Sequence, residues 1–296
     1  MPTVQPGILA LGTRNHHHLE FDLEGGDPDR LVAALAGLRE PAVTAGGANL
    51  VLGFGAVAWR ALAPDRTPDD LTPFTTVEGP GGVMPAVQHD LWIWVHGSGT
   101  DVVLDTSRAV AAALAPVASL AAEQQSFVYR ESRDLTGFID GTENPRIDEV
   151  SEVIGVPIGP GAGGSHVLLQ RWVHDLAAFH ALPLTEQEDV IGRTKADSVE
   201  LDEDRMPPAA HIARTVIEDD HGEELELFRR STAFGGVRTH GLVFVGFSGD
   251  RARLDRMTAR MVGAEDGVSD RLLRFSRPVD GAVYFTPCLE DLAALR

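Results

Sequence analysis

The hydrophobic pattern of this chain repeats one order of strands and helices on either side of a glycine-rich central segment. In the first half the pattern predicts strands at residues 19–23, 49–54, 90–96 and 123–130. Helices are predicted between them at residues 28–40, 56–63 and 100–115. The second half repeats the order, with strands at residues 166–174, 223–230, 242–247 and 282–285 and helices at residues 175–182, 185–191 and 251–262. Antiparallel sheets with helices on one face satisfy this order, so we predict an α+β fold of two ferredoxin-like halves.

The predicted halves, each an antiparallel β-sheet with helices packed on it, occupy residues 1–136 and 165–296. Residues 137–164 form the loop and linker between them. The two halves show no visible sequence similarity, so the repetition is one of pattern only. A proline-rich stretch at residues 64–85 is expected to be a long connection.

The charge of the chain restricts its partners. Lys and Arg number 25 against 44 Asp and Glu, and the formal net charge is −19, which argues against binding to nucleic acid or to an anionic membrane. One cysteine, Cys288, leaves no internal disulfide framework and no cysteine-based zinc site. We see no export signal and no stretch near the roughly 20 apolar residues of a membrane span, so a cytoplasmic protein is expected.

The central segment carries the first candidate for chemistry. Residues 137–145 read Gly-Phe-Ile-Asp-Gly-Thr-Glu-Asn-Pro. The glycines on both sides of Asp140 permit backbone angles closed to other residues and let a cofactor approach closely, while Asn144 and Pro145 end the segment as a turn. Asp140 is therefore a candidate catalytic carboxylate. On local sequence alone, an Asx-turn without chemistry is the more frequent explanation.

Histidines supply the next candidates. His16, His17 and His18 stand in a row, but neighbours on a strand point to opposite faces, so at most His16 and His18 share one and make a poor metal site. His211 follows the residues Pro-Pro-Ala-Ala at 207–210, where two small side chains leave room for a large flat cofactor. The alternative for His211 is a buried, hydrogen-bonded core histidine.

Two adjacent arginines lie on a predicted strand eighteen residues beyond His211. Alternation along a strand sends Arg229 and Arg230 to opposite faces, so one of them can point inward. A buried arginine needs an anion or a strong acceptor, whereas a surface arginine needs neither, and solvation of both is the default.

Several of these segments together resemble one family. Residues 137–145 look like the signature loop of the dye-decolorizing peroxidases, haem enzymes built from two ferredoxin-like halves. Residues 191–195, His211 with its proline-rich lead, residues 229–231 and residues 270–275 also resemble family segments, in the family's order and near its spacing. The resemblance covers nearly the whole chain, and its compact length is most similar to the bacterial B-type, or P-type, subgroup.

The resemblance implies roles for four residues. The C-terminal half would hold most of a haem b (iron protoporphyrin IX), with His211 as the proximal ligand of the iron. A carboxylate would accept a hydrogen bond from His211, and Asp270 is the candidate, with Asp266 and Asp280 as close alternatives in sequence. On the opposite face Asp140 would receive and return the peroxide proton, and Arg229 would stabilise the developing charge.

Three further positions follow from the resemblance. Arg193 would pair with a haem propionate. Ser231 stands where some relatives carry an asparagine, and its shorter side chain would leave distal water less fixed. Glu143 lies where relatives can place a manganese-binding acid, although a solvated loop glutamate is the more frequent state of such a residue. No tail that would direct the chain into a protein nanocompartment is visible.

The function implied by the resemblance is peroxide-dependent oxidation. Hydrogen peroxide would be reduced through a ferryl (compound I) intermediate, and phenols, dyes or other bulky small-molecule reductants would be oxidised. We also expect a homo-oligomer. The alternatives are a haem carrier or iron-release protein with incidental peroxidase activity, and a non-haem ferredoxin-like binding module in which His211 is a core residue.

Overall fold

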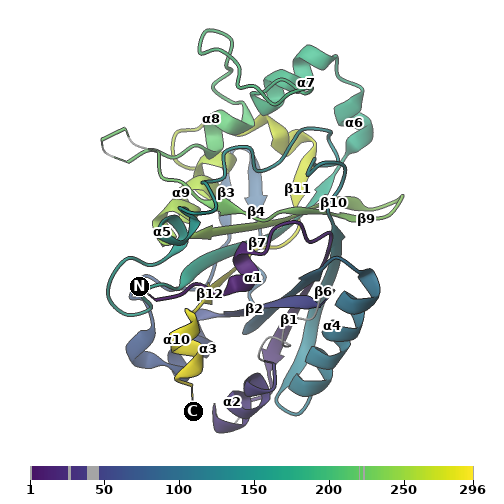
Figure 1. Ribbon diagram of the computed structural model, residues 1–296. Helices are drawn as coiled ribbons and strands as arrows, with labels where there is room; N and C mark the ends of the chain where they lie inside the picture. Colours follow the sequence, from purple (N-terminus) through teal and green to yellow (C-terminus); the bar gives the residue numbers. More distant parts are fainter. Residues whose placement is uncertain (1, 26–27, 39–46, 220, 223, 296) are drawn as a thin grey trace.

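The computed structural model of the chain describes residues 2–25, 28–38, 47–219, 221–222 and 224–295 (Figure 1). Within these residues the main sheet has ten strands, and all of its pairings are antiparallel. The mixed helix and strand content and the antiparallel sheet agree with the α+β prediction. No described helix is long and apolar enough to cross a membrane.

Four strands of the first half lie side by side in the order β2 (Ala48–Phe54), β5 (Leu91–Gly97), β1 (Asn15–Leu23) and β6 (Ala118–Phe127). Their outer face is covered by α2 (Pro28–Ala36) and α4 (Thr100–Leu114), as Figure 1 shows. Helix α4 buries Val103, Val110 and Leu114, which recur at helical spacing, because that stripe faces the sheet.

The second half has the same strand order when its four strands are numbered along the chain: the first half reads 2-3-1-4, and the second reads the same sequence in reverse, 4-1-3-2. Its strands lie in the order β12 (Ala282–Thr286), β7 (Ser165–His174), β10 (His240–Ser248) and β9 (Thr232–Gly235). The edge strands β8 (Phe228–Arg229) and β11 (Ser276–Pro278) pair with β10 and β7. The helices of this half are α6 (Leu176–His180), α7 (Leu184–Ile191), α8 (His211–Thr215) and α9 (Arg251–Val262).

The strands of the two halves join into a ring around a common interior. Strand β12 pairs with β2 at Phe285 and Phe54, β6 pairs with β9 at Phe127 and Ala233, and β7 pairs with β10. The interior is filled by large buried side chains from both halves, among them Trp92, Trp94, Val167, Val245, Phe247 and Tyr284. Burial of these aromatic residues ties the halves together.

Histidines complete this interior. His16 and His18 share the inward face of β1, and both imidazoles stack on Trp94, with ring centroids 5.6 and 5.9 Å apart. Burial lowers the pKa of His16 to about 4 and, with the charges of His16 and Arg230, that of His96 to about 2. These rings are therefore neutral core residues at ordinary pH.

Some sequence expectations are wrong in detail. The strand expected at residues 223–230 is reduced to β8, since most of that stretch meets no neighbouring strand. The connection at 64–85 contains the 3₁₀ helix η1 (Pro64–Arg66) and a hairpin of β3 (Val77–Gly79) and β4 (Gly82–Met84). Asp27, which the sequence offers as the N-cap of the helix predicted at 28–40, and the expected end of that helix lie outside the described residues. The remaining elements are α1 (Pro6–Leu9), α3 (Ala56–Leu62), α5 (Val150–Ile154), the 3₁₀ helix η2 (Arg271–Arg274) and α10 (Leu289–Ala293).

Candidate active site

A cavity lies in the second half between the sheet and its helices. Strand β7 turns alternate residues to the interior, and its other face contributes Gln170 and Trp172 to the cavity wall. Helices α8 and α9 form the opposite wall, and the loop at residues 134–143 closes one side. The cavity encloses about 1290 Å³, its open mouth included. Most of the lining is apolar, with Ile191, Ile212, Leu227, Leu242, Phe244, Met257, Met261 and Leu272.

The loop that carries Asp140 is a tight hairpin. Asp134 N–H donates to the carbonyl oxygen of Phe138 at 2.8 Å, and Asp140 N–H donates to that of Ser132 at 3.0 Å. Gly137 has φ +94°, and a Cβ there would lie 2.7 Å from the Lys195 side chain. The sequence Gly-Phe-Ile-Asp-Gly therefore fixes the turn, and the Asp140 carboxyl lines the cavity.

Asn144 fastens this loop to the strand that carries Arg229. Its side-chain oxygen accepts from Arg229 N–H at 2.8 Å, and its amide nitrogen donates to the Arg229 carbonyl oxygen at 2.8 Å. Two antiparallel bonds of this kind hold the backbone of β8 in register with the loop. The Arg229 guanidinium lines the cavity, and its buried Nε has no hydrogen-bond partner among the described residues. The sequence indicated only a turn at Asn144, because its hydrogen bonds to Arg229 join residues that are far apart in the chain.

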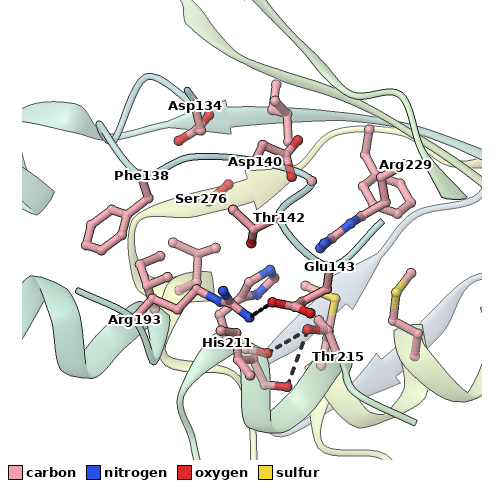
Figure 2. A pocket seen from close by; sticks show the side chains of 18 of the residues that line it. Asp134, Phe138, Asp140, Thr142, Glu143, Arg193, His211, Thr215, Arg229 and Ser276 are labelled. Atoms are coloured by element: carbon pink, nitrogen blue, oxygen red, sulfur yellow. Dashed lines mark hydrogen bonds and ion pairs between the residues drawn. The ribbon is translucent and has the colours of Figure 1, made fainter. Parts of the chain in front are cut away.

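His211 enters the cavity from the opposite wall. It is the first residue of α8, and its Nδ1 lies 2.7 Å from Asp270 Oδ2. Towards an ionised Asp270, which only accepts, Nδ1 is the donor, and in the neutral form of the imidazole Nε2 then keeps its lone pair. Figure 2 shows the His211 ring across the cavity from Asp140 and Arg229.

The structure shows which of the three candidate carboxylates, Asp266, Asp270 and Asp280, contacts His211. Asp270 is fully buried and also caps η2 by accepting from Leu272 N–H at 2.8 Å. Asp266 instead pairs with Arg214 at 2.7 Å, and Asp280 pairs with Arg171. Of these three, Asp270 alone contacts the imidazole in the described part of the chain.

Comparison with known proteins decides the family. The family description "Dyp-type peroxidase, N-terminal" matches residues 5–128, and "Dyp-type peroxidase, C-terminal" matches residues 131–291. The chain belongs to the Dyp-type peroxidase family. It is 34% identical over 303 residues to a dye-decolorizing peroxidase of Rhodococcus erythropolis, covering 99% of this chain and 89% of the relative. A dye-decolorizing peroxidase of Mycolicibacterium paratuberculosis is 36% identical over 312 residues, covering 99% and 86%. The family predicted from residues 137–145 and the activity class, a peroxidase, are confirmed.

Solved structures of Dyp-type peroxidases share the fold. A putative Dyp-type peroxidase from Shewanella oneidensis superposes with a TM-score of 0.93 at 30% identity, covering 99% of this chain and 98% of that one. A variant of DypB from Rhodococcus jostii RHA1, in complex with haem, superposes with a TM-score of 0.88 at 32% identity, covering 95% and 96%.

Arg193 of this Dyp-type peroxidase lines the cavity but is already paired. Its Nη2 lies 2.6 Å from Glu143 Oε1 (Figure 2). Nη2 also lies 3.4 Å from Glu200 Oε2, and Nη1 donates to the Ser198 carbonyl oxygen at 2.8 Å. Glu143 is thus an exposed loop residue held in an ion pair. Ser231 is not among the described residues that line the cavity, and its buried hydroxyl has no partner there.

A second arginine of the cavity wall, which was not predicted from the sequence, also keeps one donor nitrogen without a partner among the described residues. Arg253 on α9 is 3% exposed, and Nε and Nη2 donate to the carbonyl oxygens of Leu225 and Thr215. Its buried Nη1 has no partner among the described residues. Burial lowers the pKa of Arg253 to about 10, which still leaves it charged at neutral pH. The available signal was its spacing from Met257 and Met261, which places all three on one helix face.

Proposed function

We propose that this chain is a haem b peroxidase of the B-type subgroup that reduces hydrogen peroxide and oxidises phenolic, dye-like or other bulky small-molecule reductants. The observation that carries the proposal is the arrangement across the cavity. An imidazole whose Nδ1 is bonded to Asp270, and whose Nε2 has no partner among the described residues, faces a carboxylate and an unpaired guanidinium on the other side. That is the arrangement a haem peroxidase requires, with one face for the iron ligand and one for peroxide.

The side chains of the cavity fit a haem. Its apolar walls suit a porphyrin, and His211 Nε2 suits the iron. The buried, unpaired nitrogens of Arg229 and Arg253 would supply positive charge for the anionic groups of the cofactor and for the peroxide substrate. Arg193 supports the proposed propionate contact less well, because Glu143 and Glu200 already occupy it. The proposed roles of Asp270 and Ser231 as cofactor-site residues rest on the hydrogen bond to His211 and on the resemblance, respectively.

The chain's own residues handle the protons and the charge. When bound, haem would supply the two-electron redox chemistry between peroxide and reductant. Asp140, as a carboxylate, accepts the proton of the peroxide oxygen that binds and returns it to the oxygen that leaves as water. Arg229 donates hydrogen bonds to the negative charge that develops as the O–O bond breaks. Asp270 accepts from Nδ1–H and makes His211 a more electron-rich ligand.

A haem carrier or iron-release protein is the second candidate. Such a protein needs the ligand His211 but has no use for a proton acceptor and a desolvated cation opposite it. The two hydrogen bonds between the Asn144 side chain and the Arg229 backbone, here called the Asn144 clamp, fix Asp140 and Arg229 relative to one another. The clamp therefore favours catalysis. The repeated strand order supports two ferredoxin-like halves at residues 1–136 and 165–296, joined by residues 137–164, with the haem held mainly by the second. The cytoplasmic location and the homo-oligomeric state stay predictions.

The test is an absorption spectrum of the purified protein with and without added haem, compared with the His211→Ala variant. We expect a high-spin ferric, histidine-ligated spectrum and peroxide-dependent oxidation of a phenol, both lost in His211→Ala. The control is His240→Ala, which changes a histidine on β10 outside the cavity lining and should keep both. Wild-type Soret and charge-transfer bands in His211→Ala would remove the central assignment, and haem binding without peroxide turnover would favour the carrier.

A further inference from the structure

A turn of strained backbone leads from strand β6 into the hairpin that carries Asp140. Arg130, Glu131 and Ser132 follow one another with φ of +27°, +55° and +63°. None of the three is glycine, and a residue with a Cβ adopts such angles only at a cost in free energy. Of the other non-glycine residues in the described part of the chain, Ser198 alone has a positive φ. The turn at residues 130–132 therefore concentrates strain beside the hairpin.

The position of Asp140 depends on this strained turn. Asp140 N–H donates to the carbonyl oxygen of Ser132 at 3.0 Å, so its backbone is bonded directly to the last residue of the turn. Arg133 and Ile139 pair across the two arms of the same hairpin. Relaxation of the turn to ordinary backbone angles would move the Ser132 carbonyl group, and Asp140 would lose that partner or move with it.

The side chain of Arg133 joins the hairpin to a second segment of the cavity wall. Its Nη1 donates to the carbonyl oxygens of Gly137 at 2.8 Å and Lys195 at 3.0 Å, and its Nη2 donates to that of Ala196 at 3.2 Å. Gly137 lies at the tip of the hairpin, whereas Lys195 and Ala196 follow Arg193, which lines the cavity. One guanidinium thus connects the tip of the hairpin with the neighbouring wall.

The contacts of Arg133 restrain backbone more than they neutralise charge. Its ion pair with Glu131 spans 3.8 Å, and the Glu131 side chain is 85% exposed. Such a pair contributes little to stability, whereas a charged donor bonded to several carbonyl oxygens contributes more and fixes their positions. Since Arg133 directly follows the strained turn, its three bonds to carbonyl oxygens oppose relaxation of that turn.

Two other contacts fix the hairpin at points farther from the turn. Phe138 is buried against Phe179, and the Asn144 clamp holds the loop beyond Asp140. Neither contact reaches the strained residues. The arm of the hairpin that follows the turn is therefore held in place by Arg133.

We propose that Arg133 is a positioning residue, which holds the hairpin closed against the strain of residues 130–132 and so keeps the Asp140 carboxylate at the cavity. This inference rests on the proposed peroxidase function, in which Asp140 moves the peroxide proton. Arg133 itself is not among the described residues that line the cavity. Without its guanidinium the turn relaxes, the bond from Asp140 N–H to Ser132 opens more often, and the carboxylate lies less often within reach of peroxide.

The first test measures amide hydrogen exchange in the full chain without haem. Arg133→Ala should speed exchange of the Asp140 amide at least about tenfold. Adding Ser132→Gly, which adopts φ +63° without strain, should slow that exchange again at least about threefold. The control is Arg60→Ala, which removes a bond to the Leu71 carbonyl oxygen away from the cavity and should leave the Asp140 amide unchanged.

Three results of the exchange measurement would overturn the proposal. Unchanged exchange of the Asp140 amide in Arg133→Ala would show that Arg133 does not hold the hairpin. Equal acceleration in Arg60→Ala would show that the amide reports only a general loss of stability. No effect of Ser132→Gly in the Arg133→Ala chain would show that strain in the turn does not open the hairpin.

The second test uses the haem-loaded enzyme in stopped flow. Arg133→Ala should slow oxidation of the enzyme by peroxide at least about tenfold, and adding Ser132→Gly should recover part of the rate. In the Asp140→Asn background Arg133→Ala should have no further effect, because two changes that act through one group are not additive. An equal fall in both backgrounds would make Arg133 purely structural. Failure of the wild-type enzyme to react with peroxide would instead contradict the proposed function, and the exchange measurement would still test the hold of Arg133 on the hairpin.

Discussion

The arginines of the second half differ in how many of their guanidinium nitrogens have hydrogen-bond partners. That difference separates arginines with a structural role from those with a chemical role. Arg214 makes two bonds to Asp266, and Arg193 is held by acids and a backbone oxygen. Arg229 and Arg253 each keep a buried nitrogen without a partner in the described residues. Desolvation of an unpaired donor costs about 1–3 kcal/mol, so a fold that retains two of them in one cavity leaves them for a ligand.

Replacement of Arg229 tests this interpretation at one residue. Arg229→Leu should keep the haem spectrum but slow oxidation of the enzyme by peroxide about 100-fold or more, because a donor aimed at developing charge is lost. Stopped-flow absorbance measures the rate. The matched control is Arg238→Leu, at an exposed position between β9 and β10. A rate within about twofold of wild type would mean that Arg229 is a bystander.

The pH dependence of the same step tests Asp140. A carboxylate accepts a proton only when it is ionised, so the rate of oxidation by peroxide should fall on acidification in the wild-type enzyme. Asp140→Asn cannot titrate and should remove this dependence while lowering the rate. If the Asn variant keeps both the rate and the acid limb, Asp140 is structural and Arg229 or water carries out the step.

Among the elements, helices were predicted best and edge strands worst. The predicted helix at 251–262 matches α9, because Asp250 caps its start and Gly263 ends it in the left-handed conformation. The strand at 223–230 was wrong because the composition of an isolated stretch does not reveal whether a neighbour is available for pairing.

Candidate site residues likewise divide into those that the local sequence predicts and those that depend on tertiary contacts. Asp140 was predictable from the glycines that its hairpin requires, and His211 from its small neighbours. The role of Asn144 depends on Arg229, 85 residues away in the chain, and no local pattern encodes that contact. Asp270 was named among alternatives, and only the tertiary contact with His211 separated it from Asp266.

The Asn144 clamp supports a prediction at the scale of elements. Asn144→Ala should lower the free energy of unfolding by about 1–3 kcal/mol, because Arg229 N–H and C=O lose their partners. It should also slow the peroxide step while leaving the His211-dependent spectrum intact. Chemical denaturation and stopped flow measure the two effects. In the control, Asn49→Ala, only a single 3.3 Å bond to His96 O is lost, so an equal effect on the peroxide step would contradict the clamp.

For the whole molecule, the histidines buried inside the strand ring are expected to make stability depend on pH. His16, His18 and His96 are buried there, and burial lowers the pKa of each, to about 4 for His16, about 2 for His96 and well below the ordinary value for His18. In the unfolded chain the same imidazoles take up protons as pH falls through about 6.5. The unfolded state then binds more protons than the folded one, so stability is full above that pH and falls below it.

His18 isolates one of these contributions. Both of its ring nitrogens lack hydrogen-bond partners among the described residues, and its ring stacks with Trp92 and Trp94, so phenylalanine can replace it without loss of a polar contact. Repacking around the new side chain in His18→Phe changes the free energy of unfolding by the same amount at every pH. Loss of the titrating imidazole instead changes the slope of the free energy of unfolding against pH. Between pH 6 and pH 4.5, denaturant unfolding should show a free energy that falls less steeply than in wild type, by about 1.4 kcal/mol per pH unit. His240→Phe, which changes a histidine outside the ring interior, should keep the wild-type slope. An unchanged slope in His18→Phe would show that acid enters the interior without unfolding the ring.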